Sequence, residues 1–351
     1  MSSIPQTTEN GNSVSDFATK FMKRFHIGRF LFQCNAGKEK GIPVMDIFRY
    51  LFCMMFSDRS IYMQMKTGTF EGEFSKNTIY RFLNDARVNW QRFTTLLSAE
   101  IICRFMKPLT GEDRKDVFIV DDSLFDRSRS KKVEPLARVF DHCSMKYRSG
   151  FRVSLHWDGQ TGTRSCLSAT ACFPQRMTRT CFVGGNRMMA DPLQEGDAAR
   201  HGGKPQNVMV ELIHSAQCAG ITARYVLFDS WFAAPKTILE LKKQENLDTI
   251  AMLKKSKTKY RYQGEKQNVK EIYRRNKKRR GRSRYLLSVS VEIEKAGERI
   301  PAKLVFVRNK SKRKDWLVLV STDTAISEEE IIRIYGKRWD IEVFSNPANP
   351  I

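Results

Sequence analysis

Carboxylates end two short apolar segments of the chain. "DVFIVDD" at 116–122 finishes with Asp121 and Asp122, and "RYVLFDSWF" at 224–232 carries Asp229 at the same point of its pattern. Both segments predict buried strands. Carboxylate oxygens are the ligands that Mg²⁺ prefers, and two such ions can activate a nucleophile and stabilise a leaving oxygen in phosphoryl transfer. A lone strand-end aspartate is more often a turn or cap residue, so this chemistry needs a third carboxylate.

Glu342 is the candidate for that third carboxylate. The segment "EEEIIRIYGKRWDIEVF" predicts a helix that begins after Ser327, with Ser327 and Glu330 in a capping-box pattern. On this helix Tyr335, Arg338 and Glu342 fall within roughly 60° of one another, because successive residues turn by about 100°. One face would offer a metal carboxylate beside two side chains that can hold a phosphate. The plainer interpretation is an amphipathic surface helix with an incidental ion pair.

The charge balance points to a polyanionic partner. Lys and Arg number 61 against 38 Asp and Glu, for a formal charge of +23, which favours nucleic acid as the partner. Fifteen Lys and Arg lie in the segment 254–284, where Arg279 and Arg280 are candidates for DNA contact. Such blocks are usually solvated arms, but strand patterns follow here at 285–294, 301–309 and 315–322. We therefore expect a folded, basic, β-rich insertion.

The elements that must position these residues form two patterns. From about Asp16 to Met106 the pattern is helical, and "NTIYRFLND" could end a helix-turn-helix or belong to an ordinary helical bundle. A single helical run follows Ser75, which is its candidate N-cap. Beyond Gly111 strands are expected at 116–122, 151–158, 164–173, 224–232 and 248–253, with helices at 207–220 and from Pro235. This is an α/β layout with a mixed sheet.

Several classes of protein are excluded. Eight cysteines are scattered without a C-x-x-C pair and predict buried thiols in a reducing cytosol rather than a zinc site. The histidines show no metal-binding spacing. The polar N-terminus has no signal-peptide core, and no apolar run is long enough to span a bilayer.

The combined pattern resembles the DDE transposases of bacterial insertion sequences, specifically the insertion-sequence-four family. That family carries Tyr, two residues, Arg, three residues, Glu, six residues and Lys. "YGKRWDIE" matches it at Tyr335, Arg338 and Glu342. "IVDDS" matches the end of the family's first strand, with Asp122 as the ligand and Asp121 as its neighbour, and "LFDSWF" matches the fourth strand, with Asp229.

The resemblance implies the fold, the cofactor and the partners. The fold is a ribonuclease-H-like mixed-sheet core with an N-terminal helical domain and a β-rich insertion before the last catalytic helix. Two Mg²⁺ (or Mn²⁺) ions would be held by Asp122, Asp229 and Glu342. The partner is double-stranded DNA, at transposon terminal inverted repeats and target sites, bound by a homodimer in the bacterial cytoplasm and nucleoid. In "DWLVLVST" Trp316 takes the place of a tryptophan that stacks on a flipped base.

These expectations divide the chain into five parts: a disordered N-terminus at 1–15, a helical DNA-binding domain at 16–110, the first part of the core at 111–253, the basic insertion at 254–325 and the last catalytic helix at 326–351.

The chain departs from the family at its end. The family lysine falls at Asn349, and Pro347 and Pro350 cannot continue a helix. The family's C-terminal pairing segment is absent, so the sequence looks like a truncated copy. It is expected to bind DNA and to transpose poorly or not at all. Two alternatives to a transposase remain: a plain Mg²⁺-dependent nuclease, and a non-catalytic remnant that binds DNA ends.

Overall fold

The computed structural model describes most of the chain. The described residues are 14–56, 60–68, 74–109, 115–121, 125–126, 137–141, 146–151, 154–158, 205–281, 283–309, 312 and 315–338. The chain divides into two compact units, residues 1–101 with 179–190, and residues 102–178 with 191–351. Segment 179–190 and the predicted strand at 164–173 lie outside the described residues.

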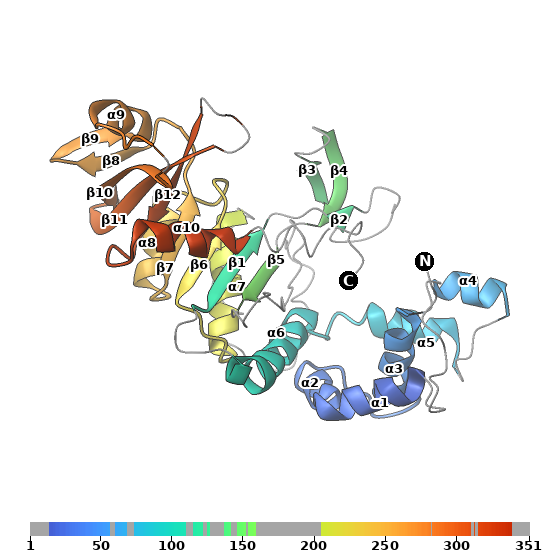
Figure 1. The fold of residues 1–351 in the computed structure, drawn as a ribbon. Helices are drawn as coiled ribbons and strands as arrows, with labels where there is room; N and C mark the ends of the chain where they lie inside the picture. Colours follow the sequence, from blue (N-terminus) through green and yellow to red (C-terminus); the bar gives the residue numbers. More distant parts are fainter. Residues whose placement is uncertain are drawn as a thin grey trace. The chain divides into compact units, whose positions relative to one another are not determined.

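The first unit is helical where it is described. Its helices are α1 (Val14–Arg24), α2 (Ile27–Gln33), α3 (Val44–Met54), α4 (Ile61–Lys66), α5 (Lys76–Leu83) and α6 (Trp90–Ile101), shown in blue to teal in Figure 1. Their buried side chains form one core, with Ile27, Leu31, Ile47 and Ile79 almost fully enclosed. Ser60 caps α4 because its hydroxyl accepts a hydrogen bond from the Met63 N–H at 3.3 Å.

The helical run expected after Ser75 is wrong in one respect, because it is interrupted. Helix α5 ends at Leu83, and α6 begins only at Trp90. Between them Asp85 accepts from the Arg87 N–H at 3.1 Å and pairs with the Arg87 guanidinium, a local turn that competes with the helix. Ser75 does occupy the N-cap position of α5, but its side chain makes no capping hydrogen bond.

The second unit is built on one mixed sheet. Nine described strands lie in the order β5-β1-β6-β7-β12-β11-β10-β8-β9. Their bounds are β1 (Val117–Asp121), β5 (Ser154–Asp158), β6 (Tyr225–Phe228), β7 (Asp248–Met252), β8 (Lys259–Tyr262), β9 (Glu265–Asn268), β10 (Tyr285–Lys295), β11 (Glu298–Arg308) and β12 (Trp316–Ser321). The predicted mixed α/β fold is confirmed, and it is consistent with a ribonuclease-H-like core.

The central strands β1, β6 and β7 pair in parallel. Helix α7 (Pro205–Cys218) precedes β6, and α8 (Pro235–Lys243) connects β6 to β7. These two helices contact each other beside the sheet. Helix α10 (Glu328–Gly336) contributes Ile331 and Ile334 to a buried cluster with residues of β1, β6 and β7. The central strands are buried on both faces, which explains why they are apolar throughout.

The residues that the sequence predicts at the ends of these helices lie at those ends. Gly220 follows α7 at φ 90°, a conformation that glycine adopts without strain. Pro235 occupies the first turn of α8. The Ser327 hydroxyl accepts from the Glu330 N–H at 3.2 Å, while the Glu330 carboxylate pairs with Arg333 instead of completing the capping box. The predicted continuation of α10 to residue 344 lies outside the described residues from 339 onward.

The basic segment 254–284 is folded wherever it is described. It contains β8, β9 and the short helix α9 (Val269–Arg275), whose N-cap Asn268 forms a full capping box with Glu271. Strands β10, β11 and β12 follow at the predicted places. Strand β12 pairs with β7, so these strands extend the central sheet rather than forming a separate one.

A second, small sheet was not predicted. It consists of β2 (Phe125–Asp126), β3 (Ala137–Asp141) and β4 (Lys146–Phe151) in the order β2-β4-β3. The expected strand at 151–158 is divided between β4 and β5. Alternation in this stretch does not reveal which strand of a hairpin belongs to which sheet, so the division was not visible from the sequence.

Exposure of the cysteines corrects one expectation. Among the described thiols Cys34 is buried, but Cys103 and Cys218 are exposed. Burial raises the pKa of Cys34 to about 11, although the nearby Arg92 opposes the shift. In the part of the chain that the structure describes, no helix is long and apolar enough to cross a membrane.

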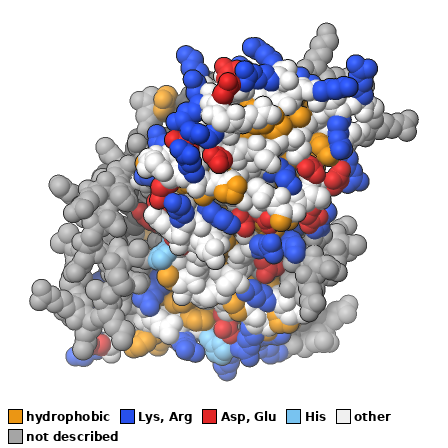
Figure 2. Space-filling model, turned by 90° about the vertical axis from the view of Figure 1, so that its left-hand side faces the viewer, with side chains coloured by type: hydrophobic (Ala, Val, Ile, Leu, Met, Phe, Trp, Pro, Cys, Tyr) orange, Lys and Arg blue, Asp and Glu red, His pale blue; other side chains and the backbone are white. Residues whose placement is uncertain are grey.

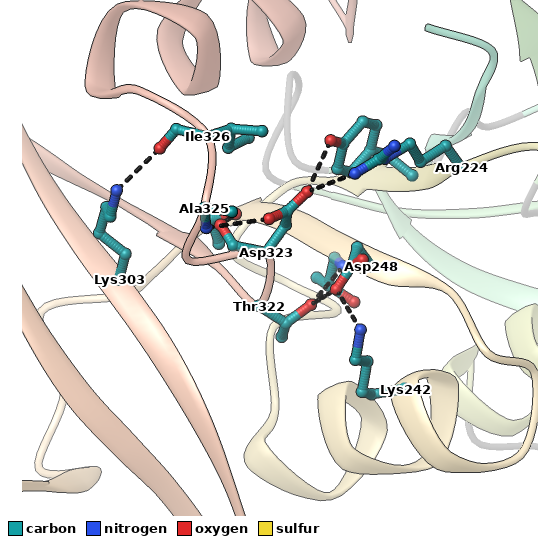
Figure 3. Close-up of polar contacts among 11 residues, drawn as sticks. Arg224, Lys242, Asp248, Lys303, Thr322, Asp323, Ala325 and Ile326 are labelled. Atoms are coloured by element: carbon teal, nitrogen blue, oxygen red, sulfur yellow. Dashed lines mark hydrogen bonds and ion pairs between the residues drawn. The ribbon is translucent and has the colours of Figure 1, made fainter.

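A buried polar network joins β6 to the segment before α10 (Figure 3). Asp323 Oδ2 accepts hydrogen bonds from the Tyr225 hydroxyl at 2.8 Å and from Arg224 at 3.1 Å, and its Oδ1 accepts from the Ala325 N–H at 3.0 Å. Burial opposes ionisation of Asp323, but these hydrogen bonds outweigh it and hold the pKa of the carboxyl below its usual value. Ionised Asp323 thus stabilises the fold at neutral pH, and this is lost as the pH falls through the lowered pKa.

Tyr225→Phe should lower the free energy of unfolding by about 1.5–3 kcal/mol, because it removes a donor from a buried carboxylate. The matched control is Tyr260→Phe, since Tyr260 is also buried but its hydroxyl makes no hydrogen bond among the described residues. Urea unfolding of the two variants measures the difference. Equal stabilities would show that the Tyr225–Asp323 hydrogen bond contributes nothing net.

Candidate catalytic site

The strand-end aspartates of β1 and β6 are brought together by parallel pairing. Val117 is level with Tyr225 and Val120 with Phe228, so the next pair in this register is Asp121 and Asp229. Neighbouring strands are about 4.8 Å apart. The two carboxylates therefore emerge side by side at one edge of the sheet, whereas the family resemblance implied Asp122, and not Asp121, as the ligand beside Asp229.

Asp229 follows β6 directly and is held by a local turn. Its Oδ1 accepts a hydrogen bond from the Trp231 N–H at 2.8 Å. This bond fixes the carboxylate orientation while leaving Oδ2 for another ligand. The residue is half-buried, so it is partly protected from water but still reachable.

Helix α10 contributes an arginine to the same edge. Val117 and Ile119 of β1 pack in the cluster that contains Ile331, Ile334 and Tyr335 of α10. Because side chains alternate along a strand, Asp121 lies on this face as well. Arg338 follows α10 and forms an ion pair with Asp121. Its Nη1 lies 3.8 Å from Asp121 Oδ1.

The environment of Arg338 is closely packed. Only 7% of the residue is exposed, and Tyr335 is equally enclosed. The neighbouring Lys337 donates from Nζ to the Lys115 carbonyl at 2.8 Å, which ties the end of α10 to the segment before β1. Tyr335 and Arg338 thus lie near the end of β1 as buried side chains, and their predicted contact with DNA stays a prediction.

Two of the predicted metal ligands, Asp122 and Glu342, lie outside the described residues. Among the residues that are described, no group of three or more His, Cys, Asp or Glu could hold a metal ion. The donors that the structure does place here, Asp121 and Asp229, are carboxylates, and their hard oxygens fit Mg²⁺ or Mn²⁺ and not a soft metal. The assignment of Asp122, Asp229 and Glu342 as ligands stays a prediction.

Trp316 lies in an aromatic cluster at the start of β12. Its ring stacks on Tyr273 of α9, with centroids 4.5 Å apart, and meets Phe306 edge-on at 5.3 Å. Lys255 Nζ lies 4.3 Å from the ring centroid and also pairs with Asp315. Trp316 therefore has a structural role in the packing of α9 on the sheet. Its predicted stacking on a DNA base stays a prediction.

Positive side chains gather over the strands and helix of the basic segment. Figure 2 shows Lys and Arg spread across the upper part of the visible face, the level at which α9 and β8 to β11 lie in Figure 1. Some are neutralised, such as Arg275 by Glu265 and Lys266 by Glu294. Arg280 is exposed, while Arg279 is exposed and lies over the Tyr285 ring at 4.3 Å.

The structure also reveals two residues that the sequence analysis did not select. Trp231 is 37% exposed next to Asp229, and Lys254 Nζ lies 4.4 Å from its ring centroid. An aromatic face and a cation beside a candidate catalytic carboxylate are suited to contact a nucleotide. The signal in the sequence was the "DSWF" motif itself, since an aromatic residue two positions after a strand-end aspartate falls at the same sheet edge.

A double-mutant cycle of Asp121→Asn and Arg338→Gln should give a coupling energy of about 1–3 kcal/mol in unfolding measurements, because the pair is mostly shielded from water. The control cycle is Glu265→Gln with Arg275→Gln. That pair is closer, at 2.6 Å, but both side chains are more than half exposed. Its coupling should be only about 0.2–1 kcal/mol. Equal coupling energies would contradict the inferred shielding.

The comparisons with known proteins identify the superfamily of the chain. A family model described as DDE superfamily endonuclease matches residues 50–314, a span that includes Asp121, Asp122 and Asp229. No protein in a search of curated sequences matches significantly. Because the match covers more than half of the chain and the matched residues fold into the sheet that carries the paired aspartates, the chain belongs to the DDE superfamily of endonucleases.

Proposed function

We propose that this protein is a transposase of the insertion-sequence-four type, which cuts and joins DNA at the ends of an insertion sequence. The observation that carries the proposal is the convergence at one sheet edge of the ends of β1 and β6 with Arg338, which follows α10. Membership of the DDE endonuclease superfamily supports nuclease or transposase chemistry on DNA. The spacing of Tyr335, Arg338 and Glu342 supports the narrower family.

Asp122, Asp229 and Glu342 are the carboxylates that would hold two Mg²⁺ or Mn²⁺ ions. When bound, such ions lower the pKa of an attacking water and neutralise charge on the leaving 3′-oxygen. The protein's own contribution is positioning. The Trp231 N–H holds one oxygen of Asp229, and the β1–β6 pairing sets the separation of the two strand ends. No covalent link between protein and DNA is required.

Asp121 has a separate role in this proposal, because it pairs with Arg338. A guanidinium at the sheet edge can hold a phosphate close to the metal carboxylates. Asp121 would orient that guanidinium through the ion pair. Asp121 is next in register with Asp229 across β1 and β6. It is therefore the alternative to Asp122 as the metal ligand of β1.

The DNA would run over the basic face of the second unit. Exposed cations without a carboxylate partner among the described residues include Lys257, Lys270, Lys277 and Arg280. Lys270 lies in α9, and the other three lie in the loops before β8 and after α9, beside strands that extend the central sheet through β12. One continuous surface could then bind the DNA backbone and present it to the carboxylates. The helical unit at 16–110 would supply further DNA binding, and pairing of two copies on DNA completes the proposal.

Binding and cleavage measured separately, with and without Mg²⁺, distinguish the proposal from its alternatives. A transposase binds its own element ends and joins the cut 3′-end to a second duplex. A plain nuclease cuts without joining, and a non-catalytic remnant binds without cutting. A joined product that appears only with a divalent ion supports the proposal. Cutting of unrelated duplexes with no joined product contradicts it.

Asp122→Asn and Asp229→Asn should each lower cleavage by at least about 10³-fold while DNA binding is retained, because an amide is a poor ligand for Mg²⁺. Asp121→Asn should lower it less, by about 10- to 100-fold, since it only loosens Arg338. Cleavage of labelled element ends under single-turnover conditions measures all three. If Asp121→Asn abolishes cleavage and Asp122→Asn does not, Asp121 is the ligand.

Binding should weaken steeply with salt, and each neutralised phosphate adds about −0.9 to the slope of log K against log salt. Reversing two exposed cations by Lys277→Glu with Arg280→Glu should flatten the slope by about 0.9 for each phosphate that these side chains neutralise in the wild type. Lys236→Glu with Lys295→Glu makes the same change in net charge away from these positions and is the control. Identical slopes for the two double variants would show that the basic segment does not touch DNA.

A further inference from the structure

Helix α5 of the first unit has two unlike faces. Ile79 and Phe82 are buried in the helical core, where Phe82 meets Trp90 edge-on at 5.3 Å. The opposite face carries Asn77, Tyr80, Arg81 and Asn84, which recur at the i, i+3, i+4 and i+7 spacing of one helical stripe. The helix is therefore anchored by its apolar side and turned outward by a polar one.

The polar groups on this stripe are not used by the fold. The side-chain amides of Asn77 and Asn84 and the Tyr80 hydroxyl make no hydrogen bond to any other described residue. Arg81 donates from Nε to the Asn77 carbonyl at 3.3 Å, and its two terminal nitrogens make no hydrogen bond to a described residue. Together with Ser75 these residues line an open hollow of about 630 Å³.

The charge around this stripe identifies the class of partner. Helix α5 contains Lys76 and Arg81 and no acidic residue. In the described part of residues 14–101, twelve Lys and Arg stand against five Asp and Glu, a difference of +7. Asparagine and arginine are also the side chains that form paired hydrogen bonds with adenine and guanine edges. A basic surface with unused amide and guanidinium groups complements the major groove of DNA.

We propose that α5 enters the major groove of duplex DNA and reads base edges through Asn77, Arg81 and Asn84. An eight-residue helix is about 12 Å long, which spans three or four base pairs. Lys76, at the first turn, contacts the phosphate backbone. The inference rests on the proposed DNA-processing function, and it adds the place where the DNA sequence is recognised.

The connection before α5 differs from the usual helix-turn-helix. Nine residues separate Lys66, the end of α4, from Lys76, whereas that motif joins its helices by three or four. Of the two alternatives for this stretch, a helix-turn-helix and an ordinary bundle, the first is therefore not present in its usual form among the described helices. The orientation of α5 depends instead on Ile79 and Phe82, which are buried in the helical core and leave the polar side of the helix exposed.

The test begins with selection of bound duplexes from a library of random 30-base-pair DNA by the full chain. The enriched sequence and a scrambled duplex of the same composition are then used as probes. Asn77→Ala and Asn84→Ala should each weaken binding to the enriched duplex by about 5- to 100-fold and leave binding to the scrambled duplex unchanged. Both changes are neutral in charge, so they do not alter the salt-dependent attraction to phosphates.

Gln33→Ala is the matched control, because it removes an exposed amide at the end of α2. It should bind both duplexes like the wild type. Selection repeated with Asn84→Ala should lose preference at one or two adjacent base pairs only. Thermal melts confirm that each variant is folded, as expected for exposed side chains.

The outcomes separate this inference from the proposed function. If the wild type enriches a sequence and the α5 variants bind it equally well, the inference is overturned while the proposed function stands. DNA binding without any enriched sequence overturns it too, since no base is then read. If the wild type binds no duplex at all, both fail.

Discussion

The parallel pairing of β1 with β6 is the constraint on which the catalytic unit depends. It joins two segments more than a hundred residues apart in the chain and makes their carboxyl ends coincide. A shift of this register by one residue would turn one aspartate toward the opposite face. The register is held by apolar side chains on both faces, with Phe118 and Phe228 fully buried on one side and Ile119 and Leu227 on the other. Core packing therefore sets the geometry of the polar edge.

Helix α10 extends the same constraint to a third segment. Ile331 and Ile334 enter the cluster formed by the strands, and this fixes where the following residues fall. Arg338 reaches the end of β1 only because α10 is anchored in this way, with Asp323 and its hydrogen bonds holding the loop before it. The buried network around Tyr225 lies at the opposite ends of the strands from Asp229. It can stabilise the fold without disturbing the site.

In the basic segment, aromatic side chains pack against the sheet while many of the cations remain exposed. Its residue Tyr273 packs α9 against Phe306 of β11 and Trp316 of β12. Some of its cations lie over these rings, as Lys255 and Lys278 do, some pair with carboxylates, as Arg275 does with Glu265, and others extend into solvent. A segment with so much like charge is usually unable to fold alone. Here its strands continue a sheet that is already anchored by the core, so the net positive charge can be kept on a rigid surface.

The sequence by itself determined the central strands β1, β6 and β7, the aspartates that follow β1 and β6, the helix start at Ser327 and the excess of positive charge. These follow from local patterns, namely apolar runs, caps and composition, which need no knowledge of partners far along the chain. Tertiary structure alone decided that Asp121 pairs with Arg338, that β8 to β12 extend the central sheet and that Trp316 stacks on Tyr273. The outward stripe of α5 belongs to the same group, whereas the break between α5 and α6 follows from a local turn of Asp85 and Arg87. Each member of this group depends on which residues far along the chain a side chain contacts. A sequence pattern indicates which face of a helix or strand is buried, but it does not indicate which other element packs on that face.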